Sequence, residues 1–514
     1  MGGEAGSDVV VRVLAVSRIA PSRQQGGRVK LSFFDTPWVG LPPVQQVFLY
    51  HLDDNDDGFP AIVSRIKAAL ADTLAHYLPL AGTLEHVADT GDLVVDWSGS
   101  DAGVAFVEAD AAGMDVRRLA SDEAHDMAAF VSLVPELQTG ALPAPLLSVQ
   151  ATRLGAGLAV GMSMHHAVAD GRGAWRFIEA WASASRAGSP VTEALGPPHF
   201  GREAVSHPRG GEELARVLLK IVAPNLPLVS STHGVRDTSQ RFRLARRTFY
   251  LSTDDIRSLR RRIDDLAASS SAPKPKPVST FVALAALVWS AFVRCKGLGA
   301  KEDTYLMFHA DLRARLDPPV SDAYLGNCVR PCVARCADAA DIAGEAGILH
   351  AARAVQAAVA EMAAAPLAGT DEAGFDAVRR LPFSRVANVA ASPRYRAYEA
   401  TDFGFGSPAR VEMVSMNHDG EMMLVGGRRD GEVQVSVAVD PAHMDTLKAC
   451  ILASSAVPAP ADSANAADVP CVGAAGALDT SVVVNFASDN EEADDAGNGG
   501  ANIFYFLCKL CSNE

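Results

Sequence analysis

The chain has 514 residues, of which 48% are hydrophobic, and 46 Lys and Arg against 61 Asp and Glu give a formal net charge of −15. This length suggests two to four domains of about 150 residues, or two larger ones. The acidic balance disfavours general binding to nucleic acid or to an anionic membrane, because both require a basic surface. It does not exclude an anionic ligand in a local basic pocket.

The termini and cysteines indicate no targeting segment or disulfide framework. Eight cysteines are few for a chain of this length. The N-terminus lacks the basic start and long apolar core of a signal peptide, and Gly6 stands where myristoylation requires Ser or Thr. The longest strongly apolar run, FVALAALVWSAFV, is shorter than the about 20 residues that a membrane helix needs. We therefore expect a soluble cytoplasmic protein.

The first half of the chain alternates between strand and helix patterns. VRVLAVSRI alternates as a strand does, and residues 59–82 carry isoleucines and leucines at four-residue spacing on one helical face, up to Pro79 and Gly82. LVVDW, LLSVQATRL and LAVGMSM are typical of strands, and AWRFIEAWASASR, after Gly173, is typical of a helix. This order predicts a layered, mixed α/β domain over residues 1–200.

Residues 201–240 are polar and irregular around one short helical piece, which predicts a crossover between two halves. Residues 241–453 then contain the strand RRTFYL, a helix entered from SAPKPKPVST, the strand TYLMFHA, an alanine-rich helix at 342–365, the strands RVEMVSM, EMMLVGG and EVQVSVAV, and a helix near 443–452. This second half repeats the architecture of the first without a repeat in the letters. Residues 454–514 are low in complexity, acidic and glycine-rich, which predicts a disordered tail.

A pair of histidines follows the strand pattern LAVGMSM, and Asp170 lies four residues after His166. With 13 histidines, about one HxxxD match arises by chance, so the spacing alone leaves open a polar strand end or an aspartate that caps the next helix. Adjacent strand residues point to opposite faces, so one of the two rings is expected to face a cavity. A neutral imidazole suits removal of a hydroxyl proton at neutral pH, which makes His166 a candidate general base.

The segment DFGFGSP, residues 402–408, contains the DFG triplet of protein kinases. The chain has no HRD sequence with a following Asn upstream, and no glycine-rich loop followed by a VAIK-like lysine strand. A kinase is therefore excluded. Two glycines between aromatic rings indicate a tight turn with ring packing.

HHAVADG and DFGFG, in this order and half a chain apart, resemble the two motifs HxxxD and DFGWG of the plant BAHD acyl-CoA-dependent acyltransferases. The segments LSFFDTPWVGLPPVQQVFLY, HYLPLAGTL, VSTFVALAALVW, DLRARLDPP and YLGNC also match the family, from about residue 9 to about residue 452. The resemblance implies an α/β fold of the chloramphenicol acetyltransferase type. Two similar-sized mixed-sheet domains, 1–200 with HxxxD and 241–453 with DFGFG, are then expected to enclose a channel.

YLGNC, residues 324–328, resembles the box of the branch that acylates anthocyanins and other phenolic glucosides, often from malonyl-CoA. The resemblance therefore implies transfer of an acyl group, malonyl by preference, from acyl-CoA to a hydroxyl of a phenolic, flavonoid or anthocyanin glucoside. Acyl-CoA is expected as a co-substrate, with no permanently bound cofactor and no metal, in a monomer. Two alternatives stay open, a hydroxycinnamoyl-CoA or other acyl-CoA donor, and a non-catalytic binding or regulatory relative.

The resemblance assigns roles around the HxxxD motif. His166 is expected to take the proton of the acceptor hydroxyl. Asp170 is expected to turn away from the cavity and pair with an arginine, with Arg313 as first choice and Arg315 as second. Gly171 is expected to support the turn.

In the family the DFGWG loop acts mainly through structure, away from the chemistry. Asp402, Gly404 and Gly406 match it residue by residue. Phe405 replaces the usual Trp, so no indole N–H is available at this position.

A malonyl carboxylate requires a cation, because a buried carboxylate without a partner is costly. Arg172 is the candidate for this acyl selectivity. Lys274 and Lys276 are candidates for the CoA phosphates, and Asn327 and Cys328 of the YLGNC box are further candidates for contact with the co-substrate.

Overall fold

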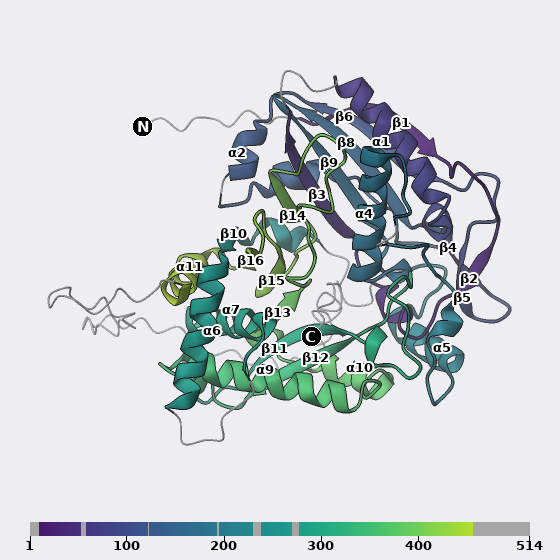
Figure 1. The fold of residues 1–514 in the computed structure, drawn as a ribbon. Coiled ribbons are helices and arrows are strands. Elements are labelled where there is room, and N and C mark those ends of the chain that lie inside the picture. Colours follow the sequence, from purple (N-terminus) through teal and green to yellow (C-terminus); the bar gives the residue numbers. More distant parts are fainter. Residues whose placement is uncertain are drawn as a thin grey trace, which may run out of the picture.

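The computed structural model describes residues 10–52, 58–121, 123–192, 195–229, 238–269 and 277–455. Within them, two six-stranded sheets form the cores of two lobes, and a four-stranded sheet lies beside the first (Figure 1). The predicted two-lobed mixed α/β architecture is thereby confirmed. The predicted tail, residues 454–514, lies almost entirely outside the described residues.

The first-lobe sheet has the order β1-β6-β8-β9-β3-β14. Its strands are β1 (Arg12–Ile19), β6 (Val104–Ala111), β8 (Leu147–Leu154), β9 (Gly157–Met164), β3 (Val44–His51) and β14 (Arg410–Met413). The smaller sheet consists of β2 (Arg28–Lys30), β5 (Asp92–Asp96), β4 (Thr83–Val87) and β7 (Ala144–Pro145).

Helices cover both faces of the first-lobe sheet. On one face α1 (Phe59–Leu74) packs along α4 (Gly171–Ala187), and the indole of Trp181 donates a hydrogen bond of 2.9 Å to the Ile66 carbonyl (Figure 1). On the other face α2 (Val116–Ser121) and α3 (Met127–Ser132) form a separate apolar cluster with β3. A sheet buried on both faces explains the nearly continuous apolar run of β9.

The second-lobe sheet has the order β10-β16-β15-β13-β11-β12 and mixes parallel and antiparallel pairs. Its strands are β10 (Ala245–Leu251), β16 (Val433–Val439), β15 (Glu421–Gly426), β13 (Val386–Ala390), β11 (Thr304–Asp311) and β12 (Val329–Cys336). The helices of this half are α6 (Thr253–Ala268), α7 (Thr280–Lys296), α8 (Ala339–Ala343), α9 (Gly347–Ala364), α10 (Glu372–Arg379) and α11 (Pro441–Ser455).

The helix predicted after SAPKPKPVST is present as α7, whereas the helix before it, α6, was missed. α7 contains the apolar run FVALAALVWSAFV and is buried on nearly all sides against α9 and α11. No helix among the described residues has both the length and the apolar character that a bilayer crossing requires. α6 was not predicted, although Ile256, Leu259 and Ile263 form its buried stripe and Ser252 begins it with a capping box.

The two lobes share structural elements, which the predicted boundaries did not anticipate. RVEMVSM was placed with the second half, but its strand β14 pairs antiparallel with β3 of the first-lobe sheet, with Arg410 opposite Leu49. In return Ala124 of the first half forms a bridge with Arg247 of β10. The pairing with β14 covers the edge of β3, whose backbone N–H and C=O groups would otherwise be unpaired on that side. The crossover, residues 201–240, contains α5 (Gly211–Val222), which packs on the short helix η1 (Thr36–Trp38).

Candidate active site

The histidine pair lies at the end of β9, where the chain leaves the sheet. Met164 pairs with Val44 as the last residue of the strand, and the short helix η3 (His166–Val168) follows. His165 begins this helix, since its Nδ1 accepts a hydrogen bond of 3.2 Å from the Ala167 amide. The strand alternation expected across the pair therefore stops before it, and both rings are buried.

The imidazole of His166 is enclosed and stacked. It lies parallel to the indole of Trp38, with ring centroids 3.9 Å apart and an interplanar angle of 7°. The side chain is 1% exposed, and neither ring nitrogen has a hydrogen-bond partner of normal geometry among the described residues. Burial lowers the pKa of His166 to about 4, and the carboxylates of Asp170 and Asp35 oppose this effect only partly. The ring is therefore neutral at neutral pH.

Asp35, a residue of the first lobe, positions Asn327 of the second lobe, which in turn binds the backbone of His166. Its carboxylate accepts hydrogen bonds from the Asn327 backbone amide at 2.8 Å and from the Asn327 side chain at 3.0 Å. The same side-chain amide donates to the His166 carbonyl at 3.0 Å. Arg202 donates to Asp35 at 2.8 Å, which balances this fully buried charge. Sequence reasoning did not single out Asp35 or Arg202; Asp35 lay only within the matching segment LSFFD.

Asp170 faces away from His166 into the second lobe. Its two carboxylate oxygens accept from Arg313 at 2.8 and 3.1 Å, which is the bidentate geometry of a strong ion pair. It also accepts from the Cys328 amide at 3.0 Å and from the Gly173 amide at 3.0 Å, and the latter bond caps α4. The expected partner Arg313 is thus present, and the capping alternative holds at the same time. Arg315 instead donates to the Asp311 carbonyl.

The two buried aspartates together explain the YLGNC box. Asp35 accepts from the backbone amide of Asn327 and Asp170 accepts from that of Cys328, so adjacent residues of the second lobe are attached to two points of the first. Both residues are fully buried, and burial raises the pKa of the Cys328 thiol. The structure places these two candidates for co-substrate contact inside the lobe junction, where their backbone amides and the Asn327 side-chain NH₂ are bonded to protein and the Asn327 Oδ1 has no partner among the described residues.

The remaining candidates near the motif are in different surroundings. Gly171 is buried at the first position of α4. Arg172 is 29% exposed and pairs with Asp322 of the second lobe at 2.6 Å. Lys274 and Lys276 lie outside the described residues.

The DFGFG loop packs on the far end of α4. Asp402 accepts hydrogen bonds from the amides of Gly404 at 2.8 Å and Gly406 at 3.1 Å, and both glycines have positive φ, +96° and +89°. Ser185 of α4 donates to the Phe403 carbonyl at 2.7 Å. Ser185 lies 15 residues after Asp170, so at 1.5 Å per residue the end of α4 that contacts the loop is about 22 Å from the end next to the HxxxD motif. The hydrogen bonds of Asp402 and Ser185 hold the loop to itself and to α4.

Phe405 fills the position of the usual Trp without an indole donor. Its ring packs edge-on against Tyr50 at 4.7 Å. The Tyr50 hydroxyl donates to the Thr401 carbonyl at 2.7 Å, at the start of the same loop.

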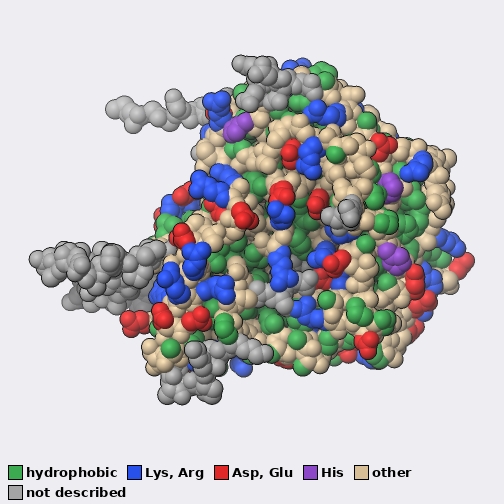
Figure 2. Space-filling view, viewed as in Figure 1, with side chains coloured by type: hydrophobic (Ala, Val, Ile, Leu, Met, Phe, Trp, Pro, Cys, Tyr) green, Lys and Arg blue, Asp and Glu red, His purple; other side chains and the backbone are tan. Residues whose placement is uncertain are grey.

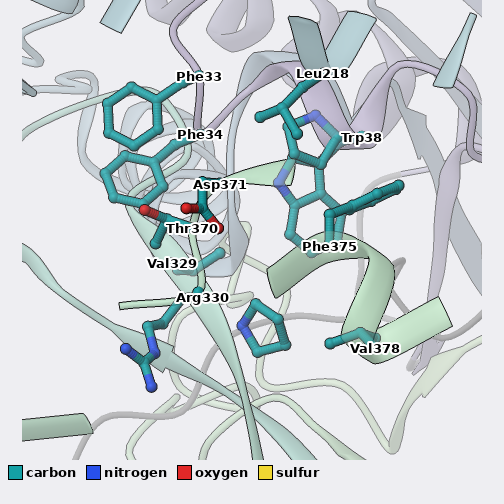
Figure 3. A pocket seen from close by; sticks show the side chains of 13 residues that line it. Phe33, Phe34, Trp38, Leu218, Val329, Arg330, Thr370, Asp371, Phe375 and Val378 are labelled. Carbon is teal, nitrogen blue, oxygen red and sulfur yellow. The ribbon is translucent and has the colours of Figure 1, made fainter. Parts of the chain in front are cut away.

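A small aromatic cavity lies beside Trp38, the residue that stacks on His166 (Figure 3). Its volume is about 40 Å³, and its walls come from both lobes and from α5: Phe33, Phe34, Pro37, Trp38, Leu218, Val329, Arg330, Pro331, Gly369, Thr370, Asp371, Phe375 and Val378. His166 is not among these residues. The channel expected between the lobes is thus closed at the imidazole, with Trp38 between this ring and the nearest aromatic walls.

A larger open cavity of about 650 Å³ carries four arginines, Arg394, Arg396, Arg428 and Arg429. Thr280 and Phe281, which line it too, begin α7 just after the segment that contains Lys274 and Lys276. Arg394 and Arg429 form no side-chain hydrogen bond or ion pair with another described residue. On the face in Figure 2 basic and acidic side chains are interspersed, so this grouping is a local feature on an acidic protein.

Solved structures define the class of fold. The chain is similar to vinorine synthase, with a TM-score of 0.61 and 18% identity over 86% of this chain and 98% of that one. It is also similar to TRI101 of F. graminearum in complex with ethyl coenzyme A, with a TM-score of 0.58 and 18% identity over 83% and 97% of the chains. The fold is therefore that of the two-lobed acyltransferases.

The family follows from the sequence comparison. The profile of the Transferase family matches residues 10–451, and the chain belongs to this family, the BAHD acyl-CoA-dependent acyltransferases. It is 29% identical over 440 residues to malonyl-CoA:anthocyanidin 5-O-glucoside-6''-O-malonyltransferase of Arabidopsis thaliana, covering 84% of this chain and 95% of that protein. It is 28% identical over 428 residues to phenolic glucoside malonyltransferase 2 of Arabidopsis thaliana, covering 82% and 92%.

A relative with another acyl group is about as similar. Identity to coumaroyl-CoA:anthocyanidin 3-O-glucoside-6''-O-coumaroyltransferase 2 of Arabidopsis thaliana is 28% over 437 residues, which covers 81% of this chain and 90% of that protein.

Proposed function

We propose that this acyltransferase moves an acyl group, malonyl by preference, from acyl-CoA to a hydroxyl of a phenolic glucoside, with His166 as the general base. The observation that carries the base assignment is the state of the His166 ring. It is neutral, it lies at the junction of the two lobes, and its nitrogens have no protein partner of normal geometry among the described residues. A buried polar atom without a partner in the protein is available for a substrate group.

The reaction needs one proton carrier. A ring nitrogen of His166 takes the proton of the acceptor hydroxyl while the oxygen attacks the thioester carbonyl. The tetrahedral intermediate then expels the CoA thiolate by breaking the C–S bond, and the imidazolium returns its proton to the thiolate. Asn327 and Asp35 hold the backbone of His166, and Asp170 with Arg313 holds the turn that follows, so the ring keeps its position through the cycle.

The arginine-lined cavity supports a site for the anionic part of the donor. Phosphate groups are bound by arginine through charge-assisted hydrogen bonds. Arg394 and Arg429 line this cavity and have no side-chain bond to another described residue, which leaves their guanidinium groups for a ligand. Lys274 and Lys276, which lie outside the described residues, stay candidates for the same phosphates.

The malonyl preference is supported by the printed names of two of the relatives above. Arg172 stays the proposed partner of the malonyl carboxylate, and it would exchange its ion pair with Asp322 for the acyl group. The coumaroyl relative, at nearly equal identity, supports hydroxycinnamoyl-CoA as the second candidate donor. That the enzyme acts as a cytoplasmic monomer stays a prediction.

The test compares donors and a histidine variant. Wild type is incubated with malonyl-CoA or p-coumaroyl-CoA and a panel of phenolic glucosides, and free CoA is measured. Turnover with malonyl-CoA supports the proposal, and turnover with p-coumaroyl-CoA alone favours the second donor. His166→Ala should lose at least about 10²-fold in rate, while His350→Ala, an exposed histidine on α9, keeps wild-type activity. Equal rates in the His166 variant and wild type would remove His166 from the role of base.

A further inference from the structure

Trp38 lies between the base and an aromatic cavity. Its indole stacks on the imidazole of His166 at 3.9 Å and also lines the cavity of about 40 Å³ (Figure 3). Trp38 is buried, and α5 packs on the short helix that carries it. Catalysis requires the imidazole to touch an acceptor hydroxyl, so a ring that is 1% exposed must be uncovered at some point in the cycle.

The aromatic lining of the cavity suits an aromatic group, but the volume of the cavity is too small to hold one. Trp38, Phe33, Phe34 and Phe375 supply four aromatic rings, and Figure 3 shows Trp38 and Phe375 on one side of it and Phe33 and Phe34 on the other. A volume of about 40 Å³ accommodates a few water molecules and no phenyl ring. The guanidinium of Arg330 turns away and donates to the carbonyls of the loop before α10. Thr370 and Asp371 are the remaining polar residues of the lining, and the Asp371 carboxylate is bonded to Arg209 and to the Gly374 amide, so the walls are mainly apolar.

The outer wall is held partly by ion pairs that are exposed to solvent and partly by buried apolar side chains. α10 supplies Phe375 and Val378, and its first turn is tied to the crossover by Arg209, which donates to Asp371 at 3.0 Å and to Glu372 at 2.7 Å. Exposed ion pairs of this kind contribute little to stability. An outward movement of this wall would break these exposed pairs and the packing of Phe375 and Val378, whereas the side that carries His166 is fixed by the buried carboxylates of Asp35 and Asp170.

We propose that Trp38 is the acceptor-selecting residue, because its indole shields His166. An aromatic ring of the acceptor enters the enlarged cavity and takes over the ring contacts of Trp38. The imidazole is then uncovered for the hydroxyl on the same acceptor molecule. The proposal rests on the proposed function and adds a requirement to it. Aromatic acceptors are favoured because their ring replaces the stacking contact that Trp38 gives up, whereas an aliphatic glucoside of similar size supplies no ring to replace this lost contact. The donor site, on the other hand, is independent of Trp38.

The shielding is measured without any substrate. Diethyl pyrocarbonate acylates neutral, accessible imidazoles, and peptide mass spectrometry with fragmentation separates His166 from His165. Modification of His166 should be slow in wild type and Trp38→Phe, which keeps a stacked ring, and at least about tenfold faster in Trp38→Ala. Trp97→Ala is the matched control, because Trp97 packs on Phe200 and lies outside the cavity. Equal rates in wild type and Trp38→Ala would overturn the proposal.

The selection is measured by kinetics. With the donor identified above, kcat/KM for phenyl glucoside should exceed that for an alkyl glucoside of equal carbon number, and Trp38→Ala should reduce this ratio at least about tenfold while the KM for acyl-CoA stays within twofold. Trp38→Leu serves if the alanine variant does not fold. An unchanged ratio, or a change confined to the KM for acyl-CoA, would overturn the proposal. A wild type without turnover on any donor contradicts the proposed function, and the modification rates still decide whether Trp38 shields His166.

Discussion

The ion pair between Asp170 and Arg313 is the contact whose loss we expect to cost the fold most, and Asp170→Asn tests it. The carboxylate is fully buried and accepts four hydrogen bonds, two from Arg313 and one each from the amides of Cys328 and Gly173. Asparagine has the same shape but presents one oxygen and an NH₂ group, so it places donors against donors. The guanidinium of Arg313 is then left inside the lobe junction with Asp311, at 3.2 Å, as its remaining counter-charge.

The magnitude follows from burial. Removal of one partner from a buried ion pair destabilises a protein by about 3–5 kcal/mol, because the other charge is left uncompensated. We expect about 3 kcal/mol for Asp170→Asn, the lower end, since one oxygen still accepts a hydrogen bond. The matched control is Asp322→Asn, which breaks the pair with Arg172, two residues after Asp170, between the same two lobes. Asp322 is 67% exposed, so its loss should cost about 0–1 kcal/mol.

The assay is urea unfolding of wild type and both variants, followed by circular dichroism and by tryptophan fluorescence. The two substitutions remove one negative charge each, so they differ in burial and not in net charge. A difference of at least about 2 kcal/mol between the variants is expected. Equal destabilisation by Asp170→Asn and Asp322→Asn would refute the conclusion that the buried carboxylate holds the lobes together.

Three further predictions concern the base, the distant loop and the donor site. The pKa of His166 is lowered to about 4, and the base is active when it is neutral. The value of kcat/KM should therefore stay level from neutral pH to about 5 and fall only near pH 4. A midpoint near 6.5 in the pH profile would contradict the burial of His166. Gly404→Ala should lower the free energy of unfolding by about 1 kcal/mol or more, because φ is +96° at this residue, and it should leave the KM of both substrates unchanged. The control Gly58→Ala, at a φ of −61°, should leave the free energy of urea unfolding nearly unchanged. Arg429→Gln should raise the KM for acyl-CoA severalfold and weaken its salt dependence without a change in kcat; an unchanged KM would place the phosphates elsewhere.

Much of the fold follows from local pattern. Apolar alternation predicted the strands, and four-residue spacing predicted α1, because these periods follow from backbone geometry alone. α6 was missed because its apolar residues Ile256, Leu259 and Ile263 are few and most of the residues between them are charged. β14 was assigned to the second half although it joins the first-lobe sheet, since a strand pattern carries no information about which sheet edge is free.

The site divides in the same way. The residue types and spacing of HxxxD, and the arginine of DLRAR, were visible in the sequence, and the expected Asp170–Arg313 pair is present. The function of Asn327 and the roles of Asp35 and Trp38 were not visible, because each acts on a residue more than a hundred positions away.

The sequence by itself therefore determined the class of fold, the family and the candidate base, since these depend on short motifs and on local periodicity. Only the tertiary structure decided that the base is neutral and covered by an indole, and that two buried carboxylates attach one lobe to the other. The physical reason is that desolvation, stacking and charge pairing depend on distances in space, and these distances exist only after residues far apart in the chain have packed together.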